Sequence, residues 1–339
     1  MNICLLTRYF DFKGSGVTRI AMEVRRELES RGHTIYPVAS RDGGLYSYFW
    51  YTAAQIPMKL PRKGIDVYHA LATLEAMWLP RHKSIAMFLD LFTDTNPERI
   101  GAGMGYSRWK LIVGRKYFEF GSRLAAHCRL ITCISDKTKQ DMMECLRMPE
   151  DKIRVIRLGI PSLEPGPKKN GRFRIGTLGQ LDKRKRIDLL IRQFKASRID
   201  AELVIAGQGM DRQILDSLAD GDSRIKFLGL VPNERLEEFY NSLDIFVFPT
   251  GVEGYGLPPV EAMSCKKPVV ILSDAIIPDE VRSRCITVPD LTALFDSPSD
   301  MDSVIKTVNY DRNYAFAKTH NWKQCVDEYV KLYEEVASG

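Results

Sequence analysis

Two carboxylates flank a glycine-rich turn in the second half of the chain. Glu253 and Glu261 are separated by seven residues, Gly254-Tyr255-Gly256-Leu257-Pro258-Pro259-Val260. An apolar stretch typical of a strand, Ile245–Phe248, precedes the turn, and a helical pattern follows it over Leu257–Ser264. Free backbone N–H groups and the positive end of a helix dipole favour an anion at such a position. Because carboxylates accept hydrogen bonds from hydroxyl groups, the segment predicts a site for a sugar joined to a phosphate.

Two further loops at the ends of predicted strands could bind phosphate. Gly14-Ser15-Gly16 would leave helix N–H groups free, but Arg19 stands where a Gly-x-Gly-x-x-Gly motif has its third glycine, which argues against a dinucleotide site. Gly179-Gln180-Leu181-Asp182 leads into four consecutive cations, Lys183-Arg184-Lys185-Arg186, which could hold a diphosphate. Simple turn geometry and a solvated charged face are the alternative interpretations of these two loops.

The composition is that of a globular protein with more than one domain. The chain has 339 residues, of which 45% are hydrophobic and 27% are charged. No apolar run approaches the roughly 18–20 residues that cross a bilayer, and the N-terminus lacks a signal-peptide pattern. Seven cysteines without a Cys-x-x-Cys pair argue against zinc and disulfides, so we expect a cytoplasmic location.

Positive charge is concentrated in the first half of the chain. Residues 1–170 contain 27 Lys and Arg against 17 Asp and Glu, a net charge of +10, whereas residues 171–339 carry a net charge of −4. An anionic partner, such as a membrane surface, and ordinary surface variation are the two interpretations of this difference.

Strand and helix patterns alternate twice along the chain, which predicts an α/β fold of two doubly wound parallel sheets. A linker rich in proline and glycine lies between the two series, at residues 161–171. We expect an N-terminal domain over residues 1–160, a second over 172–312, and C-terminal helices over 313–339 that cross back toward the first. The predicted strands are Ile3–Leu6, Ile35–Val38, Val67–Ala70, Ile85–Leu89, Leu130–Ile134, Phe173–Leu178, Leu203–Ala206, Ile225–Leu228, Ile245–Phe248 and Val269–Leu272.

Several short segments, taken in order, resemble one known family. Besides the Glu253 to Glu261 motif and the first glycine loop, they are Arg31-Gly32-His33, Cys133-Ile134-Ser135, Ile153-Arg154-Val155-Ile156, Leu228-Gly229-Leu230-Val231-Pro232, and Glu261-Ala262-Met263 before Pro268. The pattern resembles the retaining glycosyltransferases of family 4, among the group 1 glycosyltransferases. That resemblance implies the GT-B fold, in which two Rossmann-like domains, one binding the acceptor and one the nucleotide sugar, face each other across a cleft.

The resemblance also implies roles for particular residues. Glu253 would contact the hydroxyls of the donor sugar, Glu261 the ribose, and the N–H groups from Gly254 to Leu257 the sugar and diphosphate. Lys185 matches a lysine that binds the diphosphate, and Val231 falls at the base pocket. The catalytic residues would be Asp90, Lys185 and Glu253. The donor-binding residues would be Gly14, Gly16, Gly179, Gln180, Arg184, Val231, Gly254, Tyr255, Gly256, Leu257 and Glu261.

Two positions depart from the family pattern. The family usually has Arg where this chain has Gln180, so Lys183, Arg184 or Arg186 would have to replace its charge. Many members have a His-Asp pair where this chain has Leu89-Asp90, which leaves Asp90 either to orient a sugar or to cap a turn.

The implied activity is transfer of a hexose, with mannose or glucose favoured, from a UDP-, GDP- or ADP-sugar with retention of configuration. The acceptor would be a glycan or a lipid-linked molecule in polysaccharide or glycolipid biosynthesis. No metal, cofactor or nucleic acid is expected. A nucleotide-sugar-binding protein without transferase activity, a dinucleotide-dependent Rossmann enzyme and, least favoured, a glycosidase are the alternatives.

Acceptor recognition is expected in the first domain. Tyr46-Ser47-Tyr48-Phe49-Trp50-Tyr51 is unusually aromatic, and residues 100–129 combine basic and aromatic side chains. Such residues could seat the protein on the anionic inner face of a membrane. The alternative is an amphipathic helix packed on the sheet with its basic residues in water.

Overall fold

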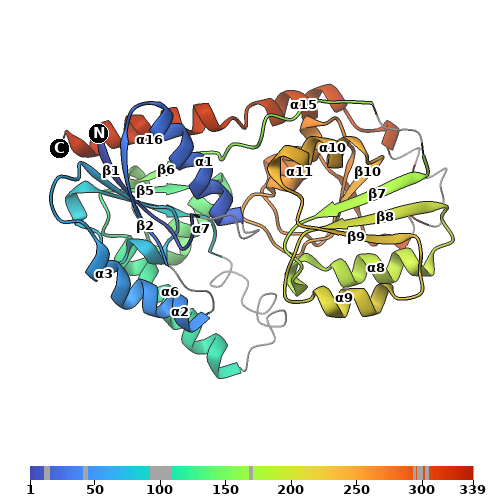
Figure 1. Cartoon of the computed structure of the whole chain (residues 1–339), viewed down its shortest axis with the longest axis horizontal. Helices are drawn as coiled ribbons and strands as arrows, with labels where there is room; N and C mark the ends of the chain where they lie inside the picture. The colour runs from blue at the N-terminus through green and yellow to red at the C-terminus, as the bar shows by residue number, and fades with distance from the viewer. Residues whose placement is uncertain are drawn as a thin grey trace. The chain divides into compact units, whose positions relative to one another are not determined.

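The computed structural model of this chain describes residues 1–10, 16–40, 45–91, 108–167, 171–292, 295, 301 and 305–338. These residues form two compact units. The first contains the described residues up to Gly159 and those from Asn321 onward, and the second runs from Ile160 to His320. Each unit has its own sheet (Figure 1).

The first unit is built on a parallel sheet with helices on both faces. Within the described residues its strand order is β2-β1-β3-β4-β5-β6. Strands β3, β4 and β5 are buried at every position, because a sheet covered on both faces has no side in water. The strands are β1 (Asn2–Leu6), β2 (Thr34–Val38), β3 (Val67–Ala70), β4 (Ser84–Phe88), β5 (Leu130–Cys133) and β6 (Ile153–Val155).

The second unit has a parallel sheet of the order β12-β11-β10-β7-β8-β9. Its chain runs outward from β7 in one direction and then returns to the other side of β7 with β10, so the strand order reverses between these two strands. The strands are β7 (Phe173–Leu178), β8 (Ala201–Ala206), β9 (Ile225–Gly229), β10 (Ile245–Phe248), β11 (Val269–Leu272) and β12 (Ile286–Val288).

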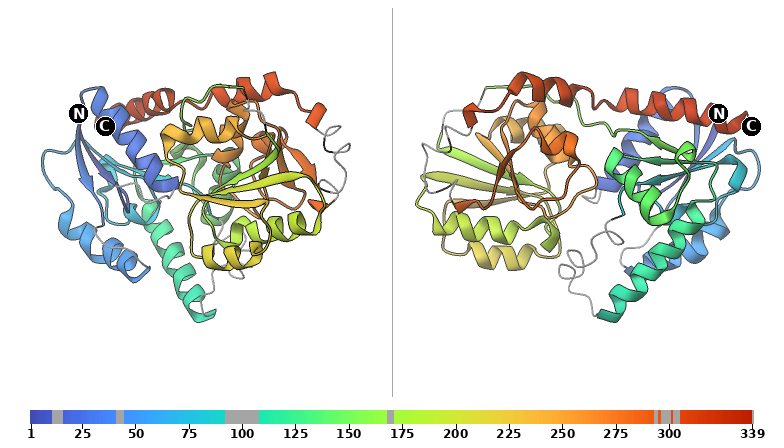
Figure 2. Two further views of the ribbon diagram at one scale, coloured as in Figure 1. Left: turned by 45° about the vertical axis from the view of Figure 1, so that its right-hand side comes forward. Right: turned by 180° about the vertical axis from the view of Figure 1, so that it is seen from behind.

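Helices connect the strands in both units, as Figures 1 and 2 show. The first unit contains α1 (Gly16–Ser30), α2 (Leu45–Trp50), the π-helical turn η1 (Tyr51–Gln55), α3 (Ile56–Lys59), α6 (Arg108–Ala125), α7 (Asp136–Leu146) and α16 (Trp322–Ala337). The second contains α8 (Ile187–Ala196), α9 (Arg212–Ala219), α10 (Leu236–Asn241), α11 (Leu257–Ser264), α12 (Asp279–Arg282) and α15 (Tyr310–Lys318). Short 3-10 helices are η2 (Leu74–Ala76), η3 (Arg81–Lys83), η4 (Glu150–Lys152), η5 (Lys183–Lys185) and η6 (Asn233–Arg235).

The predicted α/β class with two doubly wound parallel sheets is confirmed. The structure adds two strands that the sequence did not indicate, β6 and β12, each three residues long at a sheet edge. The helix predicted over residues 233–241 is divided into η6 and α10. No helix in the described ranges is both long and apolar enough to cross a bilayer.

The C-terminal helix α16 packs into the first unit through a buried histidine. Tyr333 of α16 and His69 of β3 share a hydrogen bond of 2.7 Å to Nδ1, and the ring of Tyr329 lies 4.8 Å from that of His69. His69 is fully buried, and among the described residues its Nε2 has no hydrogen-bond partner. Burial lowers the pKa of His69 to about 3.

This histidine should make the protein less stable in mild acid. Its pKa is about 3 when folded and about 6.5 when unfolded, so only the unfolded chain gains a proton as the pH falls below 6.5. At pH 5 the free energy of unfolding should be about 2 kcal/mol lower than at pH 7.5 on account of this residue. Urea unfolding at both pH values measures the loss. His69→Phe should reduce the pH dependence by that amount, whereas His82→Gln, at an exposed position, should leave it unchanged.

Candidate functional site

The topology of the second sheet brings two loops together. Strands β7 and β10 are neighbours, although β8 and β9 lie between them in the chain. In open α/β sheets, ligands bind beyond the carboxyl ends of the strands, where the strand order reverses. The loops that follow β7 and β10 are therefore where this unit is expected to bind a ligand.

The loop after β7 directs one of its four cations inward. Asp182 caps η5 by accepting a hydrogen bond from the backbone N–H of Lys185 at 3.2 Å, and Arg186 takes a left-handed conformation, with φ of 51°, before α8 begins. Lys185 is consequently 7% exposed, whereas Lys183 lies in water. A buried ammonium group needs partners, and the loop after β10 provides them.

Glu253 binds two of the four cations of the neighbouring loop. Its Oε1 accepts hydrogen bonds from Arg184 Nη1 at 2.7 Å, from Thr250 Oγ1 at 2.8 Å, and from Lys185 Nζ. The Lys185 ammonium also lies 5.0 Å from the centre of the Phe248 ring, in cation–π range. The two loops are thus joined by one carboxylate oxygen that three donors share.

The electrostatics of this cluster favour an ionised Glu253. Burial alone would raise the pKa of the Glu253 carboxyl, but the Lys185 ammonium and the Arg184 guanidinium outweigh it and hold the pKa below its usual value. Burial also lowers the pKa of Lys185, and the Glu253 carboxylate opposes that effect. Since three donors converge on one oxygen of Glu253, we take the carboxylate to be charged.

The cluster holds two cations, Arg184 and Lys185, which are groups that could bind a diphosphate; Glu253 binds both, and Asp182 also lies 3.9 Å from Arg184. Of the three cations expected to replace the family's arginine, Arg184 is the one that lies beside Lys185. Arg186 instead forms two hydrogen bonds to Asp274, at 2.8 and 2.9 Å. Gln180 is exposed, and Gly179 precedes it at the end of β7.

The glycine turn leads from Glu253 into α11 with unsatisfied backbone donors. Gly256 caps the helix in a left-handed conformation, with φ of 96°, which glycine adopts without strain. The N–H groups of Gly254 and Gly256 have no hydrogen-bond partner among the described residues. Pro258 and Pro259 contribute no N–H to the first turn of helix α11. The N–H groups of Gly254 and Gly256, before the helix, are therefore the donors left for an anion.

Two residues expected to bind the donor have their side chains inside the unit. Glu261 is fully buried, and its Oε2 accepts a hydrogen bond from the Tyr240 hydroxyl at 2.7 Å. Tyr255 is 2% exposed, and its hydroxyl hydrogen-bonds to His320. The structure therefore places Glu253 beside the cations, and Glu261 and Tyr255 within the packed interior.

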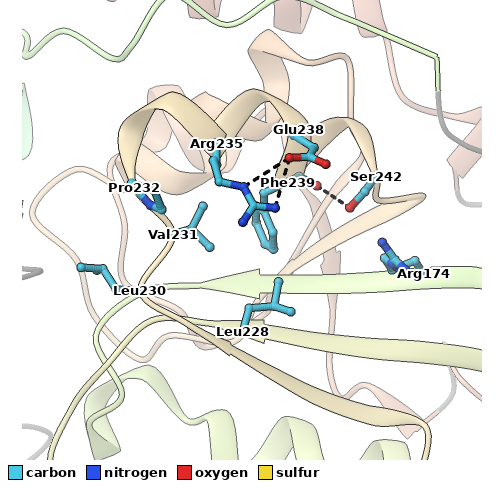
Figure 3. Close-up of a pocket in the computed structure, with 9 residues that line it drawn as sticks. All are labelled: Arg174, Leu228, Leu230, Val231, Pro232, Arg235, Glu238, Phe239 and Ser242. Carbon is cyan, nitrogen blue, oxygen red and sulfur yellow. Dashed lines mark hydrogen bonds and ion pairs between the residues drawn. The ribbon is translucent and has the colours of Figure 1, made fainter.

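Val231 lies at the edge of a cavity of about 260 Å³ between the end of β9 and α10. Figure 3 shows its side chain near those of Leu228 and Phe239, which together with Val231, Leu230 and Pro232 form the apolar part of the lining. Arg235 and Glu238 form an ion pair of 3.2 Å at the rim. An apolar cavity with polar groups at its rim could accommodate a flat ring such as a nucleotide base.

The remaining predicted residues belong to the first unit. Asp90 follows β4 and is half-buried, and Gly16 begins α1 at an exposed position with open space around it. Gly14 lies outside the described residues. Residues of the site that the sequence did not indicate are Thr250 and His320; Thr250 could have been noticed because it lies two residues after the strand that precedes the motif.

Comparisons with known proteins agree with this architecture. Residues 162–309 match the family described as glycosyl transferases group 1. The O-antigen chain mannosyltransferase B of Escherichia coli is 25% identical over 238 residues, which are 61% of this chain and 60% of that protein. The chain spans between 42% and 60% of the lengths of three curated relatives that it matches.

Solved structures share the fold over nearly the full chain. Sucrose-phosphate synthase from Thermosynechococcus elongatus superposes with a TM-score of 0.78 at 12% identity, covering 99% of each chain. HepE from Anabaena, in complex with UDP and glucose, superposes with a TM-score of 0.68 at 14% identity, covering 98% of this chain and 99% of that one. The fold is therefore GT-B, and its second unit carries the sequence pattern of the glycosyl transferases group 1.

Proposed function

We propose that this protein is a retaining hexosyltransferase that uses a nucleoside diphosphate sugar and a glycan or lipid-linked acceptor. The observation that carries the proposal is the convergence of Arg184 and Lys185 on Glu253, next to a turn with unpaired N–H groups. The cations and N–H groups would bind the diphosphate, and the carboxylate would bind sugar hydroxyls. Mannose and glucose are the favoured sugars, because related proteins are a mannosyltransferase and one that was solved with UDP and glucose.

The proposed reaction needs no side chain as nucleophile. The acceptor oxygen forms a bond to the anomeric carbon while the bond from that carbon to the diphosphate breaks, with its electron pair passing to the phosphate oxygen. That oxygen then takes the acceptor's proton. Lys185 and Arg184 would stabilise the charge on the leaving diphosphate, which is an electrostatic contribution made without a metal. Asp90 is the proposed residue for orienting a sugar hydroxyl.

Glu253→Ala should reduce sugar transfer about 10²–10³-fold, because the hydroxyls of the donor sugar lose their carboxylate partner. The measurement is product formation with UDP-, GDP- and ADP-sugars, and the anomeric configuration of the product by NMR tests retention. Glu328→Ala, at an exposed position of α16, is the matched control and should keep normal activity. Normal transfer by Glu253→Ala, or an inverted product, would contradict the proposal, and nucleotide binding without any transfer would favour a non-catalytic binding protein.

Lys185→Met should weaken nucleoside diphosphate binding about 10–100-fold, since a charge-assisted hydrogen bond to phosphate is lost. Lys183→Met removes the same charge two residues away from an exposed position, so it should change affinity much less. Titration calorimetry with UDP, GDP and ADP measures both variants and identifies the base. Equal losses in the two variants would mean that the loop acts only through its general charge.

We also propose that the first unit associates peripherally with an anionic membrane at its cytoplasmic face. The ring of Phe49 in α2 lies 4.8 Å from that of Tyr117 in α6, so α2 and α6 are adjacent. Large apolar side chains are exposed on these elements, with Trp50 and Phe120 each more than half exposed. Arg115 and Lys116 are exposed on α6, in the half of the chain that carries a net charge of +10.

Vesicles test this surface. The protein should sediment with phosphatidylglycerol vesicles and much less with phosphatidylcholine vesicles, and salt should weaken the association because the charge is screened. Trp50→Ala with Phe120→Ala should weaken binding to the anionic vesicles. Met210→Ala removes an even more exposed apolar side chain from the second unit and should not. Binding that is indifferent to lipid charge would show that the basic residues serve only as a solvated surface.

A further inference from the structure

A buried histidine fixes the direction of the Tyr255 side chain. His320 is 3% exposed and follows α15. Its Nδ1 lies 3.1 Å from the Phe316 carbonyl oxygen, which can only accept a hydrogen bond, so Nδ1 carries the proton. In the neutral ring Nε2 is then an acceptor, and the Tyr255 hydroxyl donates to it.

The histidine is itself held rigidly. The Phe316 ring packs edge-on at 4.7 Å from the His320 ring, and the Arg284 guanidinium covers Phe316 at 3.9 Å. The backbone carbonyl of His320 accepts a hydrogen bond from the Ile160 N–H at 3.1 Å. Ile160 and His320 are the first and last residues of the second unit's continuous segment, so this pair ties its two ends together.

The glycine turn is also held at its two ends. At its start, the Glu253 N–H bonds to the Ile276 carbonyl at 2.8 Å, and at its end the chain enters α11 at Leu257. Gly254 and Gly256, on either side of Tyr255, have no side chains that could anchor the turn. The buried hydroxyl of Tyr255 is thus a side-chain anchor within the turn, between the Glu253 ion cluster at its start and α11 at its end.

We propose that His320 is a positioning residue for donor binding. By accepting a hydrogen bond from the Tyr255 hydroxyl, it holds the N–H groups of Gly254 and Gly256 in the orientation that binds the donor's diphosphate. This inference rests on the proposed function, whose diphosphate the turn would bind. According to this inference, a residue at the end of α15, some 60 residues beyond the Glu253 motif, controls the affinity for the donor.

The experiment compares Tyr255→Phe, His320→Phe, the double variant and His320→Gln. Tyr255→Phe removes only the hydroxyl, and His320→Phe replaces the imidazole with a larger ring that has no acceptor. Each should weaken UDP, GDP or ADP binding about tenfold, and the double variant should be no weaker than either one. Because Gln offers an acceptor oxygen, His320→Gln should restore affinity to within about threefold of the unaltered protein. In transfer assays the donor KM should rise in the Phe variants while kcat changes less.

Hydrogen exchange in the ligand-free protein gives a readout that does not depend on activity. The hydrogen-bonded amides on either side of the turn, those of Glu253 and Val260, should exchange faster in Tyr255→Phe and His320→Phe than in the unaltered protein and in His320→Gln. Tyr314 lies on helix α15, and its hydroxyl donates a hydrogen bond to Glu164. Tyr314→Phe removes that bond and should leave the exchange of these amides unchanged. Unchanged exchange in His320→Phe, or additive losses of affinity, would overturn the inference; faster exchange without sugar transfer would uphold the anchoring while refuting the proposed function.

Discussion

The structure of the second unit's site depends on one buried carboxylate. An ionised side chain removed from water is tolerated only when it is paired and hydrogen-bonded, and Glu253 meets this requirement with Lys185, Arg184 and Thr250. Losing one partner of such a group typically costs about 3–5 kcal/mol, because the other charge stays buried. The ion cluster therefore fixes the loops after β7 and β10 relative to each other and places two cations where they meet.

The sheet topology is what makes this pairing possible. Lys185 and Glu253 are 68 residues apart in the chain, yet β7 and β10 are hydrogen-bonded neighbours, so both loops emerge at the same sheet edge. In a sheet of the order β7-β8-β9-β10, without the reversal, two strands would separate the loop after β7 from the loop after β10. The glycine turn between β10 and α11 adds N–H groups at the same edge, so charge and backbone donors lie close together without any long loop.

The sequence identified what depends on local pattern and missed what depends on packing. Apolar runs located the inner strands, whereas β6 and β12 are three-residue edge strands that are only partly buried and leave too short a pattern. The Asp182 cap of η5, which directs Lys185 into the unit and leaves Lys183 in water, is a local signal that the sequence contains. The partner of Tyr255 could not be inferred, because His320 reaches the turn only through the tertiary fold. The roles of Asp90, Val231 and the glycines in donor binding stay predictions.

The two acids of the opening motif differ in electrostatics although they lie on one short segment. Glu253 precedes the helix and pairs with cations, whereas Glu261 lies within α11, which is buried on all sides at that point, and its partner Tyr240 is neutral. In the proposed enzyme, a diphosphate would compete with Glu253 for the same cations, so donor binding there would depend on charge and salt. Glu261 is fully buried, so a ribose hydroxyl would reach it only if the packing around it opened, and it would then add a neutral donor and leave the charge unchanged. Affinity for phosphate and recognition of the ribose would then respond differently to ionic strength, because only the first involves an exchange of ion pairs.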